Sequence, residues 1–156
     1  MMPELLAIIL LATRIAVGLF FAISGYHKLT NKSRHESLVA TLTMNNIPLV
    51  KYNQWFVPIV EFGAGISLTA GFLFPLPLIG LLAICLVACI TDGAKRIAAW
   101  QPIDKADVLD DILYLPEVLY IILISILLAT GETTLSLDQH FGSDIAKMLL
   151  VDLWEK

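Results

Sequence analysis

Three charged residues, Arg14, Glu61 and Glu117, lie within stretches of sequence that are otherwise apolar. A charge at the centre of a lipid bilayer costs at least ~2.5–3.5 kcal/mol on insertion scales. Because three unpaired charges at that cost are implausible, we expect the helices that carry them to meet and to hold Arg14 between the two glutamates. Opposite charges from separate helices would then form a polar interior that is sheltered from lipid and from bulk water.

One arginine between two carboxylates leaves an excess of negative charge in this interior. We therefore expect one carboxyl group to hold a proton or to pair with Lys28 or with the Tyr114 hydroxyl. A site of this kind could bind a small molecule, a quinone headgroup or a proton. Two alternatives stay open: Arg14 and Glu61 form a structural pair that fixes the helix register, or one of the charges reaches the membrane interface.

The depths of these residues and the helical faces that they share agree with such a meeting point. At 1.5 Å per residue, Arg14 lies about 15 Å into the first apolar stretch, and Glu61 lies about 10 Å into the second, which runs the opposite way. Glu117 lies at a depth similar to that of Glu61. Gly25 shares the face of Arg14 and Gly65 shares the face of Glu61, and small residues let membrane helices approach closely.

Reactive side chains elsewhere do not combine into a catalytic or metal centre. Cys85 and Cys89 share a helical face, but cysteine is a common small core residue, and the chain has no CxxC motif and no zinc-ligand spacing. A b-type haem needs two histidines within spans, whereas His27 suits a membrane interface and His35 and His140 lie outside the apolar stretches. We expect no haem and no metal, and no nucleophile–base pair or cofactor motif marks the chain as an enzyme acting alone.

Four apolar stretches approach the roughly 20 residues that a helix needs to cross a bilayer. They cover residues 5–26, 54–74, 76–92 and 112–130. Helices are expected because backbone groups in lipid must find their hydrogen bonds within the segment. The first stretch is expected to be a span rather than a cleaved signal peptide, because no positive charge precedes it and Arg14 interrupts it. The expected fold is an all-α transmembrane four-helix bundle in one membrane domain, residues 1–156.

The connections between these stretches carry their own signals. Ser33-Arg34-His35-Glu36 fits a capping box, which predicts a short amphipathic helix in the first loop that stops at Asn45-Asn46. Pro75 and Pro77 join the second and third stretches as a tight hairpin, and residues 95–111 form a polar third loop. A second amphipathic helix is predicted at the C-terminus, where Ile145, Met148, Leu149 and Leu153 share a face.

Composition and charge agree with a membrane protein. Apolar residues make up 58% of the 156-residue chain and charged residues 15%, more apolar surface than a soluble domain of this size can bury. The net charge is −4 and there is no basic run, so nucleic-acid binding is excluded as a function. Most of the basic residues lie in loop one, between the first two stretches, and in loop three, between the last two. Because basic residues favour the cytoplasmic side, loops one and three are predicted to be cytoplasmic and both termini outside. We expect a multi-pass protein of the inner (plasma) membrane.

Several short motifs, in this order and spacing, resemble the DoxX family of small four-span membrane proteins. The motifs are Arg14 through Gly18-Leu19-Phe20-Phe21 to Ser24-Gly25 and Lys28-Leu29, then Asn46-Ile47-Pro48, then Glu61-x-x-x-Gly65 with Gly71, and finally Gly131 with Ser136-Leu137-Asp138. The chain departs from the family at Glu132-Thr133-Thr134, where a second glycine is usual, and in its longer, more charged third loop. The resemblance assigns the family's matched positions to Arg14, Gly25, Lys28, Glu61 and Asp138.

The resemblance implies a role in membrane redox chemistry. Some relatives are subunits of a membrane thiosulfate:quinone oxidoreductase, and others belong to membrane oxidoreductase complexes that handle oxidative and thiol stress. The first hypothesis is therefore an accessory subunit that docks a redox partner on its cytoplasmic loops and holds a quinone in its polar interior, with oligomerisation left open. The alternatives are a small-solute or proton conduit, which four spans without inverted repeats make less favourable, and a purely structural membrane factor.

Overall fold

The computed structural model describes residues 2–100 and 105–131, and every regular element in that part of the chain is helical. The elements are α1 (Met2–Thr30), α2 (Lys32–Met44), α3 (Val50–Ala70), α4 (Leu76–Ala88), the π-helical segment η1 (Cys89–Gly93), α5 (Ala94–Trp100), α6 (Lys105–Tyr114) and α7 (Pro116–Thr130). The expected all-α fold is confirmed.

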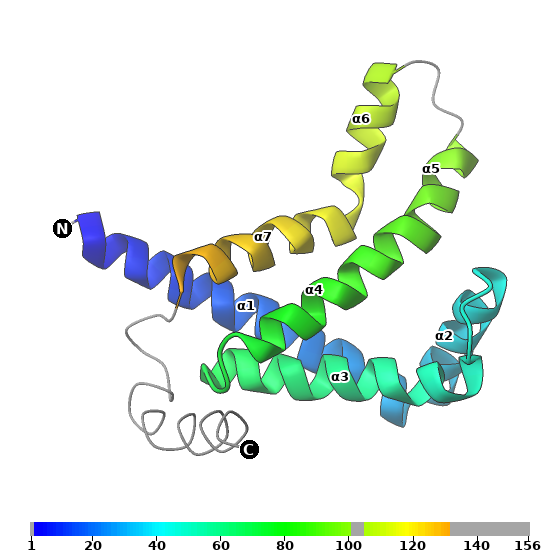
Figure 1. Ribbon diagram of the computed structural model, residues 1–156, viewed down its shortest axis with the longest axis horizontal. Helices are drawn as coiled ribbons and strands as arrows, with labels where there is room; N and C mark the ends of the chain where they lie inside the picture. Colours follow the sequence, from blue (N-terminus) through cyan, green and yellow to red (C-terminus); the bar gives the residue numbers. More distant parts are fainter. Residues whose placement is uncertain (1, 101–104, 132–156) are drawn as a thin grey trace, which may run out of the picture.

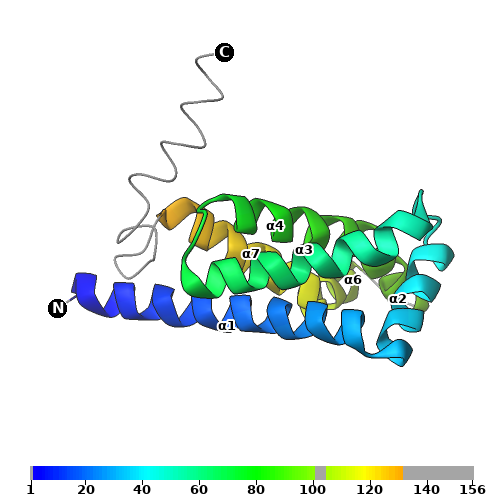
Figure 2. The same ribbon diagram turned by 90° about the horizontal axis from the view of Figure 1, so that it is seen from below.

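Helices α1, α3, α4 and α7 form a four-membered bundle (Figures 1 and 2). Each packs extensively against the next in that order, and a smaller contact between α1 and α7 closes the ring. The buried core lies where all four meet. It consists of Val17, Phe21, Leu68, Leu78, Leu81, Cys85, Ile124 and Leu127. The outward faces are also apolar, with Ile8, Ile59 and Ile90 more than half exposed, as expected of helices whose surroundings are lipid.

Glycines set the register of α1 against α3. A Cβ atom added at Gly25 would lie 2.5 Å from the backbone nitrogen of Phe62, and one added at Gly65 would meet the backbone nitrogen of Ala22. A Cβ at Gly18 would lie 2.7 Å from the backbone nitrogen of Thr69. The two backbones touch because these positions have no side chain, and this contact aligns the antiparallel helices residue by residue.

Two helices are long and apolar enough to cross a membrane: Glu4–Thr30, and the continuous helix Leu76–Trp100 that joins α4, η1 and α5. A third crossing would be the pair Val108–Tyr114 and Pro116–Thr130, which is bent by 66°. Figure 1 shows α6 turning away from the bundle at this bend. The four-span count therefore stays a prediction, whereas the helical membrane bundle is shown.

The helices on both sides of the third loop do not end where the predicted spans end. The helix that carries the predicted span 76–92 continues to Trp100, and much of the predicted polar loop is helical in α5 and α6. The predicted single helix over residues 112–130 is broken at Leu115, whose backbone is extended with φ −69° and ψ 123°. A proline disfavours the helical conformation in the residue before it, so Pro116 accounts for the break.

Helix α2 is the short helix predicted in the first loop and packs against α1 and α3, but the predicted capping box was wrong. Asn31 is the N-cap residue, and its side-chain oxygen accepts hydrogen bonds from the backbone N–H groups of Ser33 and Arg34 at 3.0 and 3.3 Å. The helix stops at Asn45, and Asn46 has a left-handed backbone with φ 52°, as the Asn-Asn stop signal indicated.

Asn31→Ala is expected to weaken α2, because the substitution removes the acceptor for two amides of its first turn. A lost N-cap costs about 1 kcal/mol. Hydrogen exchange should accelerate several-fold at the amides of residues 32–36 and stay unchanged in α3. Ser33→Ala is the control and should have little effect. If Ser33→Ala has the larger effect, the cap assignment is wrong.

The hairpin between α3 and α4 is short, as predicted, with five residues between Ala70 and Leu76. The predicted C-terminal amphipathic helix (Ile145, Met148, Leu149 and Leu153) lies outside the described residues, and so does Asp138.

Candidate functional site: a cleft beneath α2

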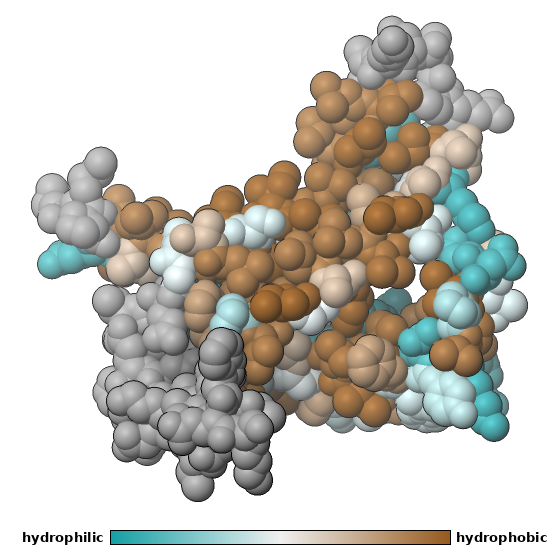
Figure 3. All heavy atoms as spheres, in the orientation of Figure 1, coloured by the Kyte–Doolittle hydropathy of each residue, from teal (hydrophilic) through white to brown (hydrophobic). Residues whose placement is uncertain are grey.

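A cleft of about 680 Å³ lies at the α2 end of the bundle. Its walls come from α2, α3, α4 and η1, with single contributions from α1 and α7. In the space-filling view, the surface opens between the hydrophobic helices and the hydrophilic end of the molecule at α2 (Figure 3). The cleft thus lies where an apolar bundle changes into a polar surface.

The first polar feature of the cleft is an ion pair between α1 and α3. Lys28 Nζ lies 2.7 Å from both carboxylate oxygens of Glu61, and the Ser24 hydroxyl donates to Glu61 Oε2 at 3.4 Å. The Glu61 side chain is only 6% exposed and the Lys28 side chain 26%. A buried carboxylate that a lysine neutralises with both oxygens engaged is a charge-assisted contact of the stronger kind. The predicted pairing of a carboxyl with Lys28 is therefore present.

The second polar feature brings four further elements together, namely the end of α2, η1, α5 and α7. Arg96 lies between two carboxylates, with Nε 3.2 Å from Asp92 Oδ2 and Nη2 2.6 Å from Glu117 Oε1. Asn45, at the end of α2, donates from Nδ2 to Asp92 Oδ1 at 3.4 Å. Asn45, Asp92 and Glu117 line the cleft, and Arg96 lies behind them outside its lining. This cluster (Asn45, Asp92, Arg96 and Glu117) carries one cation against two carboxylates.

The π-helical segment η1 helps to place this cluster. Its wider turn follows α4 directly and carries Asp92. Gly93 is buried, and a Cβ there would lie 3.0 Å from Leu115 Cδ1, so α7 begins directly against this turn. The close contact brings Glu117, in the first turn of α7, to Arg96. Single π-helical turns inside α-helices are frequent at functional sites.

The remaining walls of the cleft are largely apolar. They include Leu38, Leu42, Phe56, Val57, Ala83, Ile84, Val87 and Ala88. Helix α2 forms one side of the cleft and contacts α3 and α5. The His35 ring lies 4.5 Å from the ring of Trp55, with the two planes tilted by 34°, and Lys95 donates from Nζ to the carbonyl oxygen of Met44. The arrangement suits a ligand with an apolar body and a polar headgroup.

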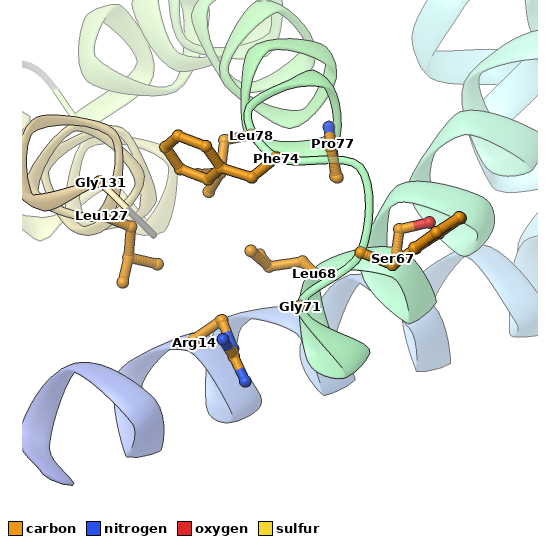
Figure 4. Close-up of a pocket in the computed structure, with 10 residues that line it drawn as sticks. Arg14, Ser67, Leu68, Gly71, Phe74, Pro77, Leu78, Leu127 and Gly131 are labelled. Carbon is orange, nitrogen blue, oxygen red and sulfur yellow. The ribbon is translucent and has the colours of Figure 1, made fainter. Parts of the chain in front are cut away.

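Arg14 does not take part in this site, so the predicted position between Glu61 and Glu117 was wrong. Arg14 is buried at 7% exposure and lines a separate cavity of about 30 Å³, with Leu68 and Gly71 from the end of α3 and Leu127 from α7 (Figure 4). Along α1, fourteen residues separate it from Lys28, which is about 21 Å at the helical rise. The register set by the glycines places Arg14 beside the end of α3, far from Glu61.

The other predicted site residues fall in different places. Glu61 is buried at 4% exposure, as expected, and Gly25 lies against the backbone of Phe62 one turn from Lys28. Tyr114 is 81% exposed, so its hydroxyl is not the buried partner of a carboxyl group that one of the predicted arrangements needed. Its ring faces Trp100 at 6.5 Å, in an edge-to-face arrangement that suits an interfacial aromatic pair.

The sequence indicated Glu117 as a candidate site residue, but not Asn45, Arg96 or the ion pair between Arg96 and Glu117. The Asn45-Asn46 pair predicts only a helix stop, and no pattern in the sequence brings Arg96 to Glu117. The signal that could have found the second pair is the proline at residue 116, because a break there places Glu117 in the first turn of a new helix. Within the described residues, no group of three or more His, Cys, Asp or Glu side chains could hold a metal ion.

The fold and the cleft define a small helical membrane protein with a polar recess at one end of its bundle. The chain belongs to the DoxX family, whose model matches residues 9–92, more than half of the sequence. The match includes Lys28, Glu61 and Asp92, and it ends before Arg96 and Glu117. No curated protein and no solved structure matches the chain.

Proposed function

We propose that the protein is an accessory subunit of a membrane redox complex and that its cleft binds a lipid-soluble quinone by the headgroup. The observation that supports this proposal is the cleft of about 680 Å³, with apolar walls and two separate ion-paired clusters. Ligand pockets commonly have volumes of about 300–1,000 Å³ and a few placed polar groups. A substituted benzoquinone ring fits that size, and its alkyl chain would leave along the apolar walls.

The position of the cleft supports a role at the cytoplasmic side of the inner membrane. Lys28, Lys32, Arg34 and Lys51 lie on the elements around the cleft, and basic residues near the ends of spans favour the cytoplasmic side. A soluble or membrane redox partner would dock on the polar surface formed by α2 and α5, next to the open side of the cleft. In this arrangement the subunit holds the quinone and the partner supplies the electron transfer.

A cleft-filling substitution tests the proposal. Ala88 lines the cleft, and Ala88→Phe places a ring in the space that the headgroup would occupy. A decyl-substituted benzoquinone titrated into the protein in nanodiscs should bind saturably to the wild type and at least ~10-fold more weakly to Ala88→Phe, since 1.4 kcal/mol of lost contact corresponds to tenfold. Binding is measured by quenching of tryptophan fluorescence, because Trp55 adjoins α2.

The matched control is Ala98→Phe, on the same continuous helix but exposed and outside the cleft lining. It should bind the quinone as the wild type does, and both variants should keep the wild-type unfolding midpoint within a few degrees. Equal binding by wild type and Ala88→Phe would show that the quinone partitions into lipid or binds elsewhere, and the proposal would be abandoned.

A further inference from the structure

The cluster beside Asn45 presents hydrogen-bond acceptors that the described residues leave unused. Asn45 Oδ1 and Glu117 Oε2 are buried and have no hydrogen-bond partner within residues 2–100 and 105–131. Both belong to side chains that line the cleft. Leaving a buried polar group without a partner costs about 1–3 kcal/mol, so a ligand that supplies a donor there gains more than it would at a satisfied site.

The orientation of the Asn45 amide follows from its neighbour. Asp92 Oδ1 is an acceptor, so the amide must turn its NH₂ group toward Asp92 and its oxygen away from it. Exchanging the two amide atoms would set oxygen against carboxylate. The unused atom at this position is therefore an acceptor.

The unused atom of Glu117 is also a hydrogen-bond acceptor. Glu117 Oε1 faces Arg96 at 2.6 Å, which leaves Oε2 for another donor. Arg96 Nε and Nη2 pair with the two carboxylates by charge, at 3.2 and 2.6 Å, without forming a hydrogen bond. Both nitrogens are buried and Arg96 lies outside the cleft lining, so they face the carboxylates rather than a ligand in the cleft. Lys28, the cation of the other ion pair in the cleft, already donates to both oxygens of Glu61.

We propose that the cleft selects the reduced form of its ligand, the quinol, through Asn45 Oδ1 and Glu117 Oε2. The inference rests on the proposed quinone-binding function and adds which redox form is held. A quinol carries two hydroxyl donors, whereas a quinone headgroup carries only carbonyl acceptors. Both oxygens are buried, so a quinol hydroxyl donates to one of them once the Asn45 or Glu117 side chain turns it toward the cleft. Neither oxygen gives up a hydrogen bond in that turn, and the amide of Asn45 gives up only its 3.4 Å contact with Asp92. A quinone carbonyl would instead face a carboxylate and an amide oxygen.

The test compares affinities for both redox forms of one probe. The decyl-substituted benzoquinone and its dithionite-reduced hydroquinone are titrated anaerobically into the full-length protein in nanodiscs. The wild type should bind the hydroquinone at least ~10-fold more tightly, because one hydrogen bond to a charged acceptor contributes about 1.5–3 kcal/mol. Glu117→Gln and Asn45→Ala should each reduce this ratio, the former toward one. Glu36→Gln, an exposed carboxylate on α2 outside the cleft, should leave it unchanged.

The outcomes separate this inference from the function on which it rests. Equal affinities for the two forms in the wild type, with binding still lost in Ala88→Phe, would overturn the quinol preference and keep the quinone site. A preference that survives both Glu117→Gln and Asn45→Ala would overturn the assignment of the acceptors. No binding of either form by the wild type would overturn both proposals.

Discussion

Lys28→Met is expected to destabilise the protein by about 3–5 kcal/mol, the usual loss when one partner of a buried ion pair is removed. The substitution leaves the Glu61 carboxylate at 6% exposure with, among residues 2–100 and 105–131, only the Ser24 hydroxyl, 3.4 Å away, as a hydrogen-bond donor. Glu61→Gln should cost less. Lys28 is 26% exposed, and its long side chain can carry the charge out to water. The measurement is reversible unfolding in mixed detergent micelles, followed by circular dichroism.

The double variant Lys28→Met/Glu61→Met removes both charges and should recover most of the stability, because an apolar pair of similar volume can replace a buried ion pair. Lys32→Met is the matched control. Its pair with Glu36 lies on the surface, with side chains 90% and 66% exposed, and its loss should change stability by less than about 0.5 kcal/mol. If Lys28→Met and Lys32→Met behave alike, Glu61 does not carry a buried charge in the folded protein.

Gly65→Leu is expected to separate α1 from α3 and to cost about 3 kcal/mol or more, as severe overpacking does. Even a single Cβ at this position would collide with the backbone nitrogen of Ala22, and a backbone cannot yield as a flexible side chain can. Because Lys28 and Glu61 come from the two helices that separate, the cleft should lose its quinone binding as well. Stability and binding are measured on the same nanodisc preparation.

Gly63→Ala provides the control two residues away. A Cβ at Gly63 meets no atom within 4 Å, and glycine is about 1 kcal/mol less favourable than alanine inside a helix. The variant should therefore be as stable as the wild type or slightly more stable, with normal binding. Wild-type stability in Gly65→Leu would refute the backbone contact that sets the register.

The sequence predicted the positions of the apolar helices better than it predicted the contacts between charged residues on different helices. Apolar runs identified α1, α3, α4 and α7, because burial in lipid needs only hydrophobicity and length. The pairing of charges depends on the register between helices, which the limits of apolar runs do not determine. The contacts at Gly18, Gly25 and Gly65 determine it instead, and they place Lys28, not Arg14, beside Glu61.

Sequence signals near the ends of helices were also correct in part and wrong in part. The Asn45-Asn46 stop was predicted correctly, since asparagine tolerates the left-handed conformation that Asn46 adopts. The capping box was wrong because Asn31, two residues earlier, is the better cap, and both patterns lie in one polar stretch. The π-helical turn at Cys89–Gly93 has no sequence signature, and it carries one wall of the cleft.

Photolabelling in native membranes tests most directly whether the cleft beneath α2 holds a quinone-type headgroup. A photoreactive benzoquinone is bound, illuminated and located by peptide mass spectrometry. We expect adducts on cleft residues of α2, α3 and α4, such as Leu38, Val57 and Ile84, removed by excess unlabelled quinone and missing in Ala88→Phe. Adducts confined to lipid-facing positions such as Ile8 and Ile79, and undiminished by competitor, would contradict the claim.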